Sequence, residues 1–323
     1  MEKIIADEPK NFIVNENVLI SPKARKNKKV YQITDVHSDV GALIKAFEIA
    51  KNYRLDAIII TGDLIDSTND PRNEKLAKVM RYYAFTLGLP IVVVKGNHDE
   101  VIFTHDENGK RKEEYSEDDT FFREISCYPN VHVVKDSAEL IPIDNDIEVV
   151  GVNIPYNCYP EKDYSTFDIV GSINKLDIDP EKFTMTAIHY LNPEVVSLLS
   201  SLENALHEPS KLKDIQLFLS GHMHAGCTPI WLRQVLNHIK ILHSRGLVGP
   251  YFTLGSKDAY GLILYNMIAA IISGGVTKFA VSSEAKGVGT KLNKVFVPET
   301  EIIDIIPGED LQFIQESRKK MAA

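Results

Sequence analysis

The chain has 323 residues, 44% of them hydrophobic, and a mass of 36.3 kDa, so it is long enough to form a large buried core. The formal net charge of -9 and the pI near 5.6 argue against a broadly basic surface of the kind that captures nucleic acid or an anionic membrane. A local basic patch is compatible with this charge, but we expect no nucleic-acid partner.

Cysteine usage and the N-terminal residues bear on the compartment. Cys127, Cys158 and Cys227 lie far apart in the sequence, which predicts neither a disulfide framework nor a structural zinc site and is typical of a reducing cytosol. Residues 1–29 are expected to form a polar N-terminal arm, without the apolar segment that a signal peptide needs. The longest apolar stretch, residues 261–276, is shorter than the about 20 residues that span a bilayer, so it is interpreted as buried core. A cytoplasmic location is expected.

Apolar strand patterns alternate with helical patterns at the start of the chain. Strands are expected over residues 30–34, 57–61 and 91–95, with helices over 40–52 and 72–87. This alternation predicts parallel strands joined by right-handed crossovers. Further strands are expected over residues 131–134, 147–152, 183–188 and 215–219. The charged segment 104–119 is expected to be an exposed excursion.

Polar residues that can bind metal follow five of the expected strands directly. They are Asp35 and His37, Asp63 and Asp66, Asn97 and His98, His189, and His222 and His224. In open α/β sheets, functional sites lie in the crevice beyond the carboxyl ends of the strands. These residues are therefore predicted to meet at one site.

The residue types in these clusters suit a metal-dependent hydrolase. Asp35 and His37 lie two apart on an expected extended segment, so their side chains would point the same way and could bind one ion. Asp63 could bridge two ions through its two oxygens. Mixed nitrogen and oxygen ligands favour zinc, manganese or iron over calcium. Two such ions about 3.5–4 Å apart can activate a bridging water for in-line attack on a phosphoryl group.

His98 is expected to act on the substrate rather than on a metal. It follows Asn97 but would face another direction, so it could stabilise developing charge or protonate the leaving oxygen. Asp66 is a candidate partner that holds the tautomer of His98.

The alternative without function is that each of these short sequence patterns arises by chance. Gly62, Gly96 and Gly221 could simply be turns with positive φ at strand ends. However, five of the ten histidines lie in these clusters, each at a strand end, and core histidines have no reason to gather in this way. The joint arrangement favours the metal interpretation.

With its D-x-H, G-D-x-x-D, G-N-H-D, lone His and G-H-x-H blocks in this order, the chain resembles the calcineurin-like metallophosphoesterase family over residues 35–224. The resemblance implies an α/β fold, a four-layer α/β/β/α sandwich of two mixed sheets flanked by helices, over residues 30–323. It also implies a dinuclear enzyme that hydrolyses a phosphomonoester or phosphodiester by attack of a metal-bridging hydroxide.

The same resemblance implies two ligand sets and two further roles. One metal would be bound by Asp35, His37, Asp63 and His224, and the other by Asp63, Asn97, His189 and His222. His98 would be the catalytic histidine, with Asp66 behind it. The metals would be two divalent ions, either Mn, Zn or Fe.

Two features bear on the substrate. Asp66 is followed by Ser67, and Asp99 by Glu100, where the protein Ser/Thr phosphatases of this superfamily have arginines, so a phosphoprotein substrate is disfavoured. The C-terminal third resembles a bacterial branch of membrane-associated phosphoesterases and UDP-diacylglucosamine pyrophosphohydrolases, through residues 230–247, 271–277 and 295–304.

That branch implies a capping insertion at about residues 230–260, where apolar residues at roughly helical spacing alternate with basic ones. This helix could receive a lipid-like or apolar leaving group, rest on a membrane surface as a peripheral contact, or bury its apolar face against its own domain.

Two other functions stay open at the level of sequence. A catalytically silent scaffold usually loses ligands or the catalytic histidine, and all of these are present here. A nuclease acting on DNA ends usually carries long extra domains, for which 323 residues leave little room. The substrate, the metal identity and the oligomeric state do not follow from the sequence, because specificity lies in loops outside the shared site.

Overall fold

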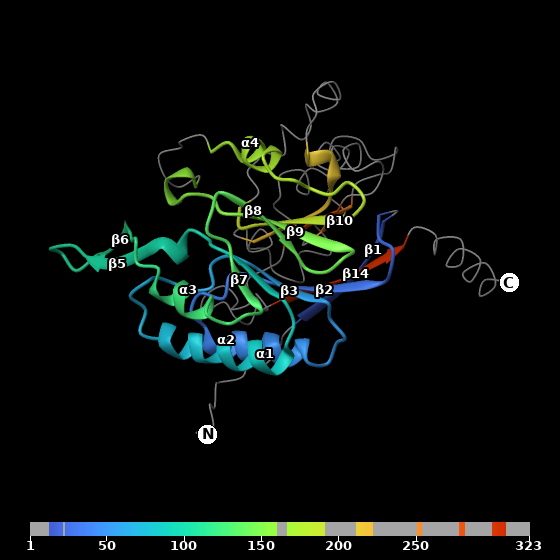
Figure 1. Ribbon diagram of the computed structural model, residues 1–323. Helices are drawn as coiled ribbons and strands as arrows, with labels where there is room; N and C mark the ends of the chain where they lie inside the picture. Colours follow the sequence, from blue (N-terminus) through green and yellow to red (C-terminus); the bar gives the residue numbers. More distant parts are fainter. Residues whose placement is uncertain are drawn as a thin grey trace, which may run out of the picture.

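The computed structural model describes residues 13–21, 23–159, 167–190, 211–221, 251–253, 278–281 and 299–307. Within them the chain forms two six-stranded sheets that lie face to face, with helices on the outer sides (Figure 1).

The first sheet has the order β1-β14-β2-β3-β4-β7 among the described residues. Its strands are β1 (Ile13–Ser21), β14 (Glu299–Pro307), β2 (Lys28–Ile33), β3 (Ala57–Thr61), β4 (Ile91–Val94) and β7 (Val131–Val133). From β2 to β7 all neighbours are parallel, as the βαβ pattern predicts, whereas β14 is antiparallel to β2.

Three helices cover the outer face of this sheet: α1 (Val40–Ala50), α2 (Asn73–Leu87) and α3 (Thr120–Ile125). Helix α1 begins where the Asp39 carboxylate accepts a hydrogen bond from the Ala42 amide at 2.9 Å, which satisfies one of the first N–H groups of the helix. Helix α2 ends at Gly88, whose φ of 61° gives the left-handed cap that glycine adopts readily.

The second sheet has the order β12-β13-β11-β10-β9-β8 in the described part of the chain. Its strands are β12 (Tyr251–Thr253), β13 (Lys278–Val281), β11 (Ile215–Ser220), β10 (Phe183–Ile188), β9 (Ile147–Val152) and β8 (Ala138–Pro142). Helix α4 (Ile169–Asn174) packs on its outer face through Ile169 and Ile173. Short 3-10 turns, η1 (His98–Glu100), η2 (Tyr156–Cys158) and η4 (Lys211–Asp214), connect some of these elements.

Strand β3 shows why a strand in the middle of the first sheet is almost entirely apolar. Ile58 and Ile60 pack against the helices, whereas Ala57 and Ile59 pack into the core between the two sheets. A strand that is buried on both faces reads as a continuous apolar run rather than an alternating one. The layers are therefore helices, sheet, sheet and helix, which confirms the expected α/β/β/α sandwich.

Two segments differ from the sequence expectations. Residues 13–21, inside the stretch predicted to be an N-terminal arm, form β1 and pair in parallel with β14 at the edge of the first sheet. Most of the expected excursion 104–119 belongs to an antiparallel hairpin of β5 (Val101–His105) and β6 (Arg111–Tyr115). Figure 1 shows that this hairpin projects away from the two sheets.

The C-terminal expectations are largely outside the described residues. Of the capping insertion at about 230–260, only residues 251–253 are described, and they form β12. The apolar stretch 261–276 also lies outside. Among the described helices, none has both the length and the apolar character needed to cross a bilayer. The division into an arm and one domain stays a prediction.

Candidate metal centre

The loops that follow β2 and β3 are joined by backbone hydrogen bonds. The amides of Asp35 and His37 donate to the carbonyl oxygens of Gly62 and Asp63, at 3.0 and 2.9 Å. The Gly221 amide donates to the His189 carbonyl at 2.9 Å and so ties the ends of β10 and β11 together. Strand ends that are far apart in sequence thus meet at one place, as predicted.

Asp35, Asp63 and His189 form what we call the buried cluster. At most 1% of each residue is exposed, and each offers a ligand atom within 4.8 Å of the others. The Nε2 atom of His189 lies 3.2 Å from Asp63 Oδ2 and 3.2 Å from Asn97 Oδ1. On the other side of the ring, Nδ1 lies 2.8 Å from the Thr61 carbonyl oxygen. Since a carbonyl only accepts, Nδ1 donates, and Nε2 is directed to the Asp63 carboxylate and the Asn97 amide oxygen.

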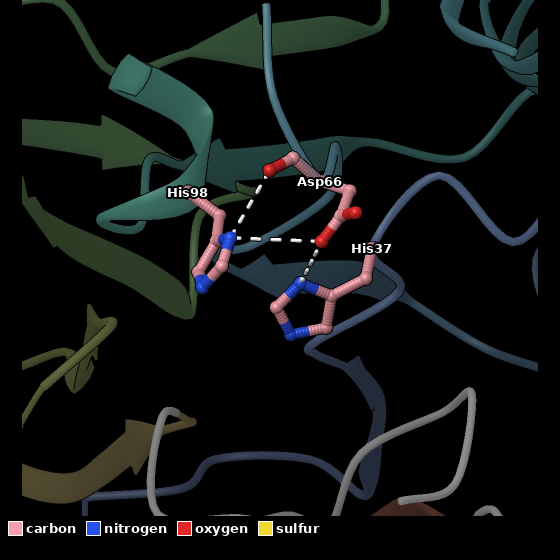
Figure 2. Close-up of side chains that lie close together, drawn as sticks. All are labelled: His37, Asp66 and His98. Carbon is pink, nitrogen blue, oxygen red and sulfur yellow. Dashed lines mark hydrogen bonds and ion pairs between the residues drawn. The ribbon is translucent and has the colours of Figure 1, made fainter. Parts of the chain in front are cut away.

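His37, Asp66 and His98 form the rim cluster (Figure 2). Asp66 Oδ1 lies 3.4 Å from His37 Nδ1 and 3.6 Å from His98 Nδ1. The two imidazole rings meet edge to face, with centroids 4.7 Å apart. His37 Nε2 lies 3.6 Å from Asp63 Oδ2, so His37 connects the rim cluster to the buried cluster.

The partner of His98 is the backbone as well as the side chain of Asp66. His98 Nδ1 lies 3.0 Å from the Asp66 carbonyl oxygen, closer than the carboxylate at 3.6 Å. Nδ1 therefore donates to this carbonyl, and Nε2 is the ring nitrogen on the side away from Asp66 (Figure 2). The His98 amide donates to Asp63 Oδ1 at 2.9 Å, and this bond holds the backbone of His98 against the buried cluster.

The backbone of the D-x-H block is not extended, so this expectation was wrong. Within the described residues, the non-glycine residues with positive φ are Asp35, His37, Ser38 and Asp63, at 48° to 56°. This left-handed backbone directs Asp35 into the buried cluster and His37 into the rim cluster. Such a conformation is costly for a residue with a Cβ and persists only where the surroundings impose it, which is common at functional sites.

The charges of the buried cluster attract a cation. Burial alone would raise the pKa of Asp63, but the neighbouring His189, His37 and His98 together outweigh burial and hold that pKa well below the ordinary value. Burial alone would lower the pKa of His189, but the charge and hydrogen bond of Asp63, together with Asp35 and the Thr61 carbonyl, outweigh burial and raise that pKa to about 10. A divalent ion can supply the positive charge in place of this proton. Carboxylate, imidazole and amide oxygen ligands fit such an ion.

Asp99 is a residue of the site to which the sequence interpretation gave no role. Its carboxylate is buried and accepts hydrogen bonds from the Ile65 amide at 2.9 Å and the Gly96 amide at 2.8 Å. Burial and the charge of Asp63 raise its pKa to about 7. It joins the loops that follow β3 and β4. Its place in the G-N-H-D block was the signal that could have identified it.

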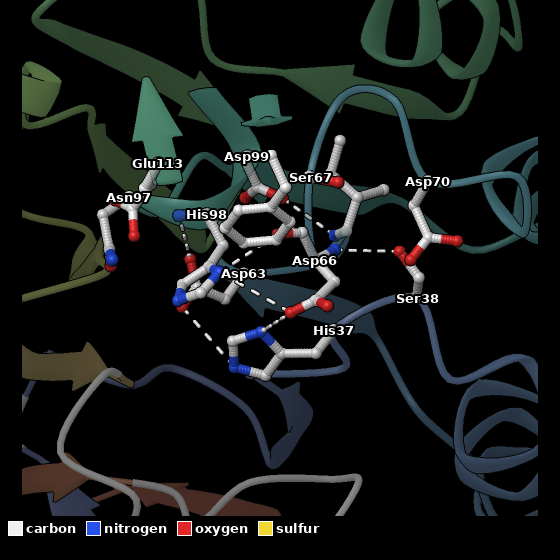
Figure 3. Close-up of polar contacts among 12 residues, drawn as sticks. His37, Ser38, Asp63, Asp66, Ser67, Asp70, Asn97, His98, Asp99 and Glu113 are labelled. Carbon is white, nitrogen blue, oxygen red and sulfur yellow. Dashed lines mark hydrogen bonds and ion pairs between the residues drawn. The ribbon is translucent and has the colours of Figure 1, made fainter. Parts of the chain in front are cut away.

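Thr34 and Ser38 also hold the site and were not predicted. The Thr34 hydroxyl donates to Asp35 Oδ2 at 2.6 Å. The Ser38 hydroxyl accepts from the Asp66 amide at 2.8 Å (Figure 3) and donates to Asn73 Oδ1 at 2.9 Å. Each cluster thus has a hydroxyl that fixes one of its carboxylate residues.

Two glycines allow the loops to approach. Gly62 has a φ of 89°, and a Cβ at this position would collide with the ring of His189. A Cβ at Gly221 would collide with the side chains of Thr34 and Asp35, so the start of the G-H-x-H block lies against the buried cluster. His222 and His224 lie outside the described residues, and their role as ligands stays a prediction.

A family model described as calcineurin-like phosphoesterase matches residues 28–226, more than half of the chain. A cAMP/cGMP dual specificity phosphodiesterase of Mycobacterium tuberculosis is 32% identical over 74 residues. The aligned part covers 23% of this chain and 23% of that protein, so the chain matches less than a quarter of this relative's length.

Solved structures with a similar arrangement are remote in sequence. A Haemophilus influenzae NAD nucleotidase has a TM-score of 0.47 at 11% identity, over 81% of this chain and 46% of its own. A Thermus thermophilus protein has a TM-score of 0.45 at 13% identity, over 80% of this chain and 91% of its own. A dimetal phosphatase from Danio rerio has a TM-score of 0.42 at 10% identity, over 80% of this chain and 88% of its own.

Proposed function

This chain belongs to the calcineurin-like phosphoesterase family, and we propose that it is a dinuclear metal-dependent phosphoesterase that hydrolyses a phosphomonoester or phosphodiester. The observation that carries this proposal is the contact between the two clusters. Asp63 Oδ2 lies 3.2 Å from His189 Nε2 and 3.6 Å from His37 Nε2, so one carboxylate oxygen faces potential ligands of two ions.

The proposed ligands are the seven residues that the sequence indicates. Asp35, His37, Asp63 and His224 would bind one ion, and Asp63, Asn97, His189 and His222 the other. Two divalent ions, when bound, would lower the pKa of a water held between them and neutralise the oxygens of the phosphoryl group. Manganese, zinc and iron all suit this set of nitrogen and oxygen ligands.

His98 is proposed to be the general acid. Its Nδ1 donates to the Asp66 carbonyl, so Nε2 is the nitrogen that would carry a proton to the leaving oxygen. Asp66 is proposed to be a positioning residue, because its carboxylate lies between the two histidines and its backbone carbonyl holds Nδ1 of His98. His98 lies next to Asn97 in sequence, which would bring its ring beside a substrate bound at the metals.

The finer assignments rest on the resemblance of the C-terminal third. A relationship to UDP-diacylglucosamine pyrophosphohydrolases, a lipid-like or apolar substrate, and a peripheral membrane contact all depend on residues beyond 229, few of which are described. They stay proposals, as does a cytoplasmic location.

The test is hydrolysis of bis(para-nitrophenyl) phosphate and para-nitrophenyl phosphate by protein that has been stripped with a chelator and reloaded with manganese, zinc or iron. Metal-dependent release of nitrophenol, abolished in Asp63→Asn, supports the proposal. A native protein that binds two ions but hydrolyses neither ester, nor a wider panel of mono- and diesters, would be the silent scaffold. Degradation of DNA in preference to small esters would identify a nuclease.

A further inference from the structure

The β5–β6 hairpin brings an aromatic ring and a guanidinium to the rim cluster. The Phe103 ring lies against the His98 ring, with centroids 6.1 Å apart. The Arg111 guanidinium stacks on the Phe103 ring, with its Cζ atom 3.2 Å from the ring centroid. Its Nη2 atom lies 3.8 Å from Asp66 Oδ2. The hairpin therefore extends the site beyond His98 with a positive charge.

A second arginine lies at the same distance from Asp66 but in a different setting. Arg72 Nη2 is also 3.8 Å from Asp66 Oδ2. However, the Nε atom of Arg72 donates to both carboxylate oxygens of Asp70, at 2.9 and 3.1 Å, and Nη2 donates to Asp70 as well. The charge of Arg72 is thus already compensated by a bidentate pair.

Arg111 is not held in this way. Among the described residues the structure gives it one ion pair, to Asp66, and that separation of 3.8 Å is longer than a hydrogen bond. About half of its side chain, 54%, is exposed. Stacking on Phe103 fixes the plane of the guanidinium and leaves its N–H edge for a planar anion, which it can bind with two hydrogen bonds.

We propose that Arg111, stacked on Phe103, forms an anion subsite that binds a carboxylate or phosphate on the leaving group of the substrate. This proposal rests on the proposed function. His98 would protonate the leaving oxygen, and the leaving group would then extend past His98 toward Phe103 and Arg111, away from the buried cluster. The substrate class is therefore a phosphoester whose leaving group carries a second negative charge.

The alternative is that Arg111 only compensates the charge of Asp66. Arg72 lies at the same distance of 3.8 Å from the same oxygen, so under this alternative its removal should have the same kind of effect on the two diesters. Arg72→Gln is therefore the matched control for Arg111→Gln: each removes one positive charge beside Asp66, but only one removes the subsite.

The experiment compares two chromogenic diesters on manganese-loaded protein: methyl para-nitrophenyl phosphate, and its analogue with a carboxylate on the ring meta to the phenolic oxygen. In Arg111→Gln, KM for the carboxylated diester should rise relative to that for the plain diester by roughly three- to tenfold, as expected for one partly exposed, charge-assisted pair. In Arg72→Gln this ratio should not change. If Arg111→Gln raises KM for both diesters by the same factor, so that the ratio of the two KM values does not change, the subsite is overturned.

A binding measurement separates this proposal from the proposed function. Calorimetric titration with the carboxylated nitrophenol should give a dissociation constant that Arg111→Gln raises by the same factor and Arg72→Gln does not. Hydrolysis of neither diester by the native protein, with this difference in binding intact, counts against the proposed function and supports the subsite. Equal dissociation constants in native protein and Arg111→Gln would overturn the subsite even if both diesters are hydrolysed.

Discussion

The buried cluster and the rim cluster are built from the same residue types in opposite settings. Asp35, Asp63 and His189 are at most 1% exposed, whereas the side chains of Asp66 and His98 are 23% and 27% exposed. Burial strengthens the attraction between a carboxylate and a cation, so the first cluster is suited to holding ions. Partial exposure lets the second meet a substrate. His37, whose side chain is only 8% exposed, is the rim residue that is assigned to a metal, so depth separates holding from acting within the rim cluster as well.

The largest effect is expected from Asp63→Asn, which removes the carboxylate shared by both clusters. The variant should keep its fold but lose affinity for both ions. The loss should exceed the about 10²-fold reduction that follows when a residue supporting a metal ligand is removed. Metal content measured by emission spectroscopy after dialysis checks this. A variant that retains two ions and full activity would show that Asp63 does not bridge.

His98→Ala should act on catalysis without emptying the metal site. Because His98 lies in the exposed cluster and its ring contacts Asp66 rather than the buried carboxylates, kcat should fall by about 10²–10⁴-fold, the loss typical of a general acid, at unchanged metal content. Asp66→Asn is the control and should give a milder loss of the same kind, since the backbone carbonyl still accepts from His98. Loss of a metal from His98→Ala would mean that His98 is a ligand.

Gly62→Ala should disturb the buried cluster in two ways: alanine strains a backbone with positive φ, and its Cβ collides with the His189 ring. Gly62 and Gly109 both have positive φ, 89° and 74°, but only at Gly62 would a Cβ collide with a neighbour, the His189 ring. Gly109→Ala, with open space around it, should cost about 1 kcal/mol of stability. Gly62→Ala should cost about 2–3 kcal/mol and also weaken metal binding. Urea unfolding of both variants tests this, and equal losses would show that His189 moves aside freely.

The sequence was most informative where strands are buried on both faces. The expected strands 57–61, 147–152 and 183–188 match β3, β9 and β10 residue for residue, and every residue of these three strands is buried. Asp35, Asp63, Asn97 and His189 each follow the carboxyl end of an expected strand, where open α/β sheets place their sites, so their convergence also followed from the pattern.

The strand at the sheet edge, the hairpin strand and the left-handed backbone of the site could not be predicted from apolar patterns. Strand β1 contains the polar run Asn15 to Asn17 and forms only by pairing with β14, from the far end of the chain. The hairpin strand β6, from Arg111 to Tyr115, is almost entirely polar and is held by its partner rather than by burial. The left-handed φ at Asp35 and His37 is imposed by the neighbouring loops, and no local pattern announces it.

The smallest effect is expected from Thr34→Val, which keeps the shape of the side chain and removes one hydroxyl. This hydroxyl lies 2.6 Å from Asp35 Oδ2, in a position where no part of Thr34 is exposed. Without it the carboxylate loses a donor that orients it, and metal affinity should fall by about tenfold, at the lower end of the range for such supporting contacts. At saturating metal, kcat should approach that of the native protein, since the rim cluster is untouched. Thr34→Ser retains the hydroxyl and should behave like the native chain. The dependence of activity on manganese concentration in the three proteins decides the matter. A fall in kcat that extra manganese does not restore would mean that Thr34 supports the reaction itself, and that depth does not separate holding from acting.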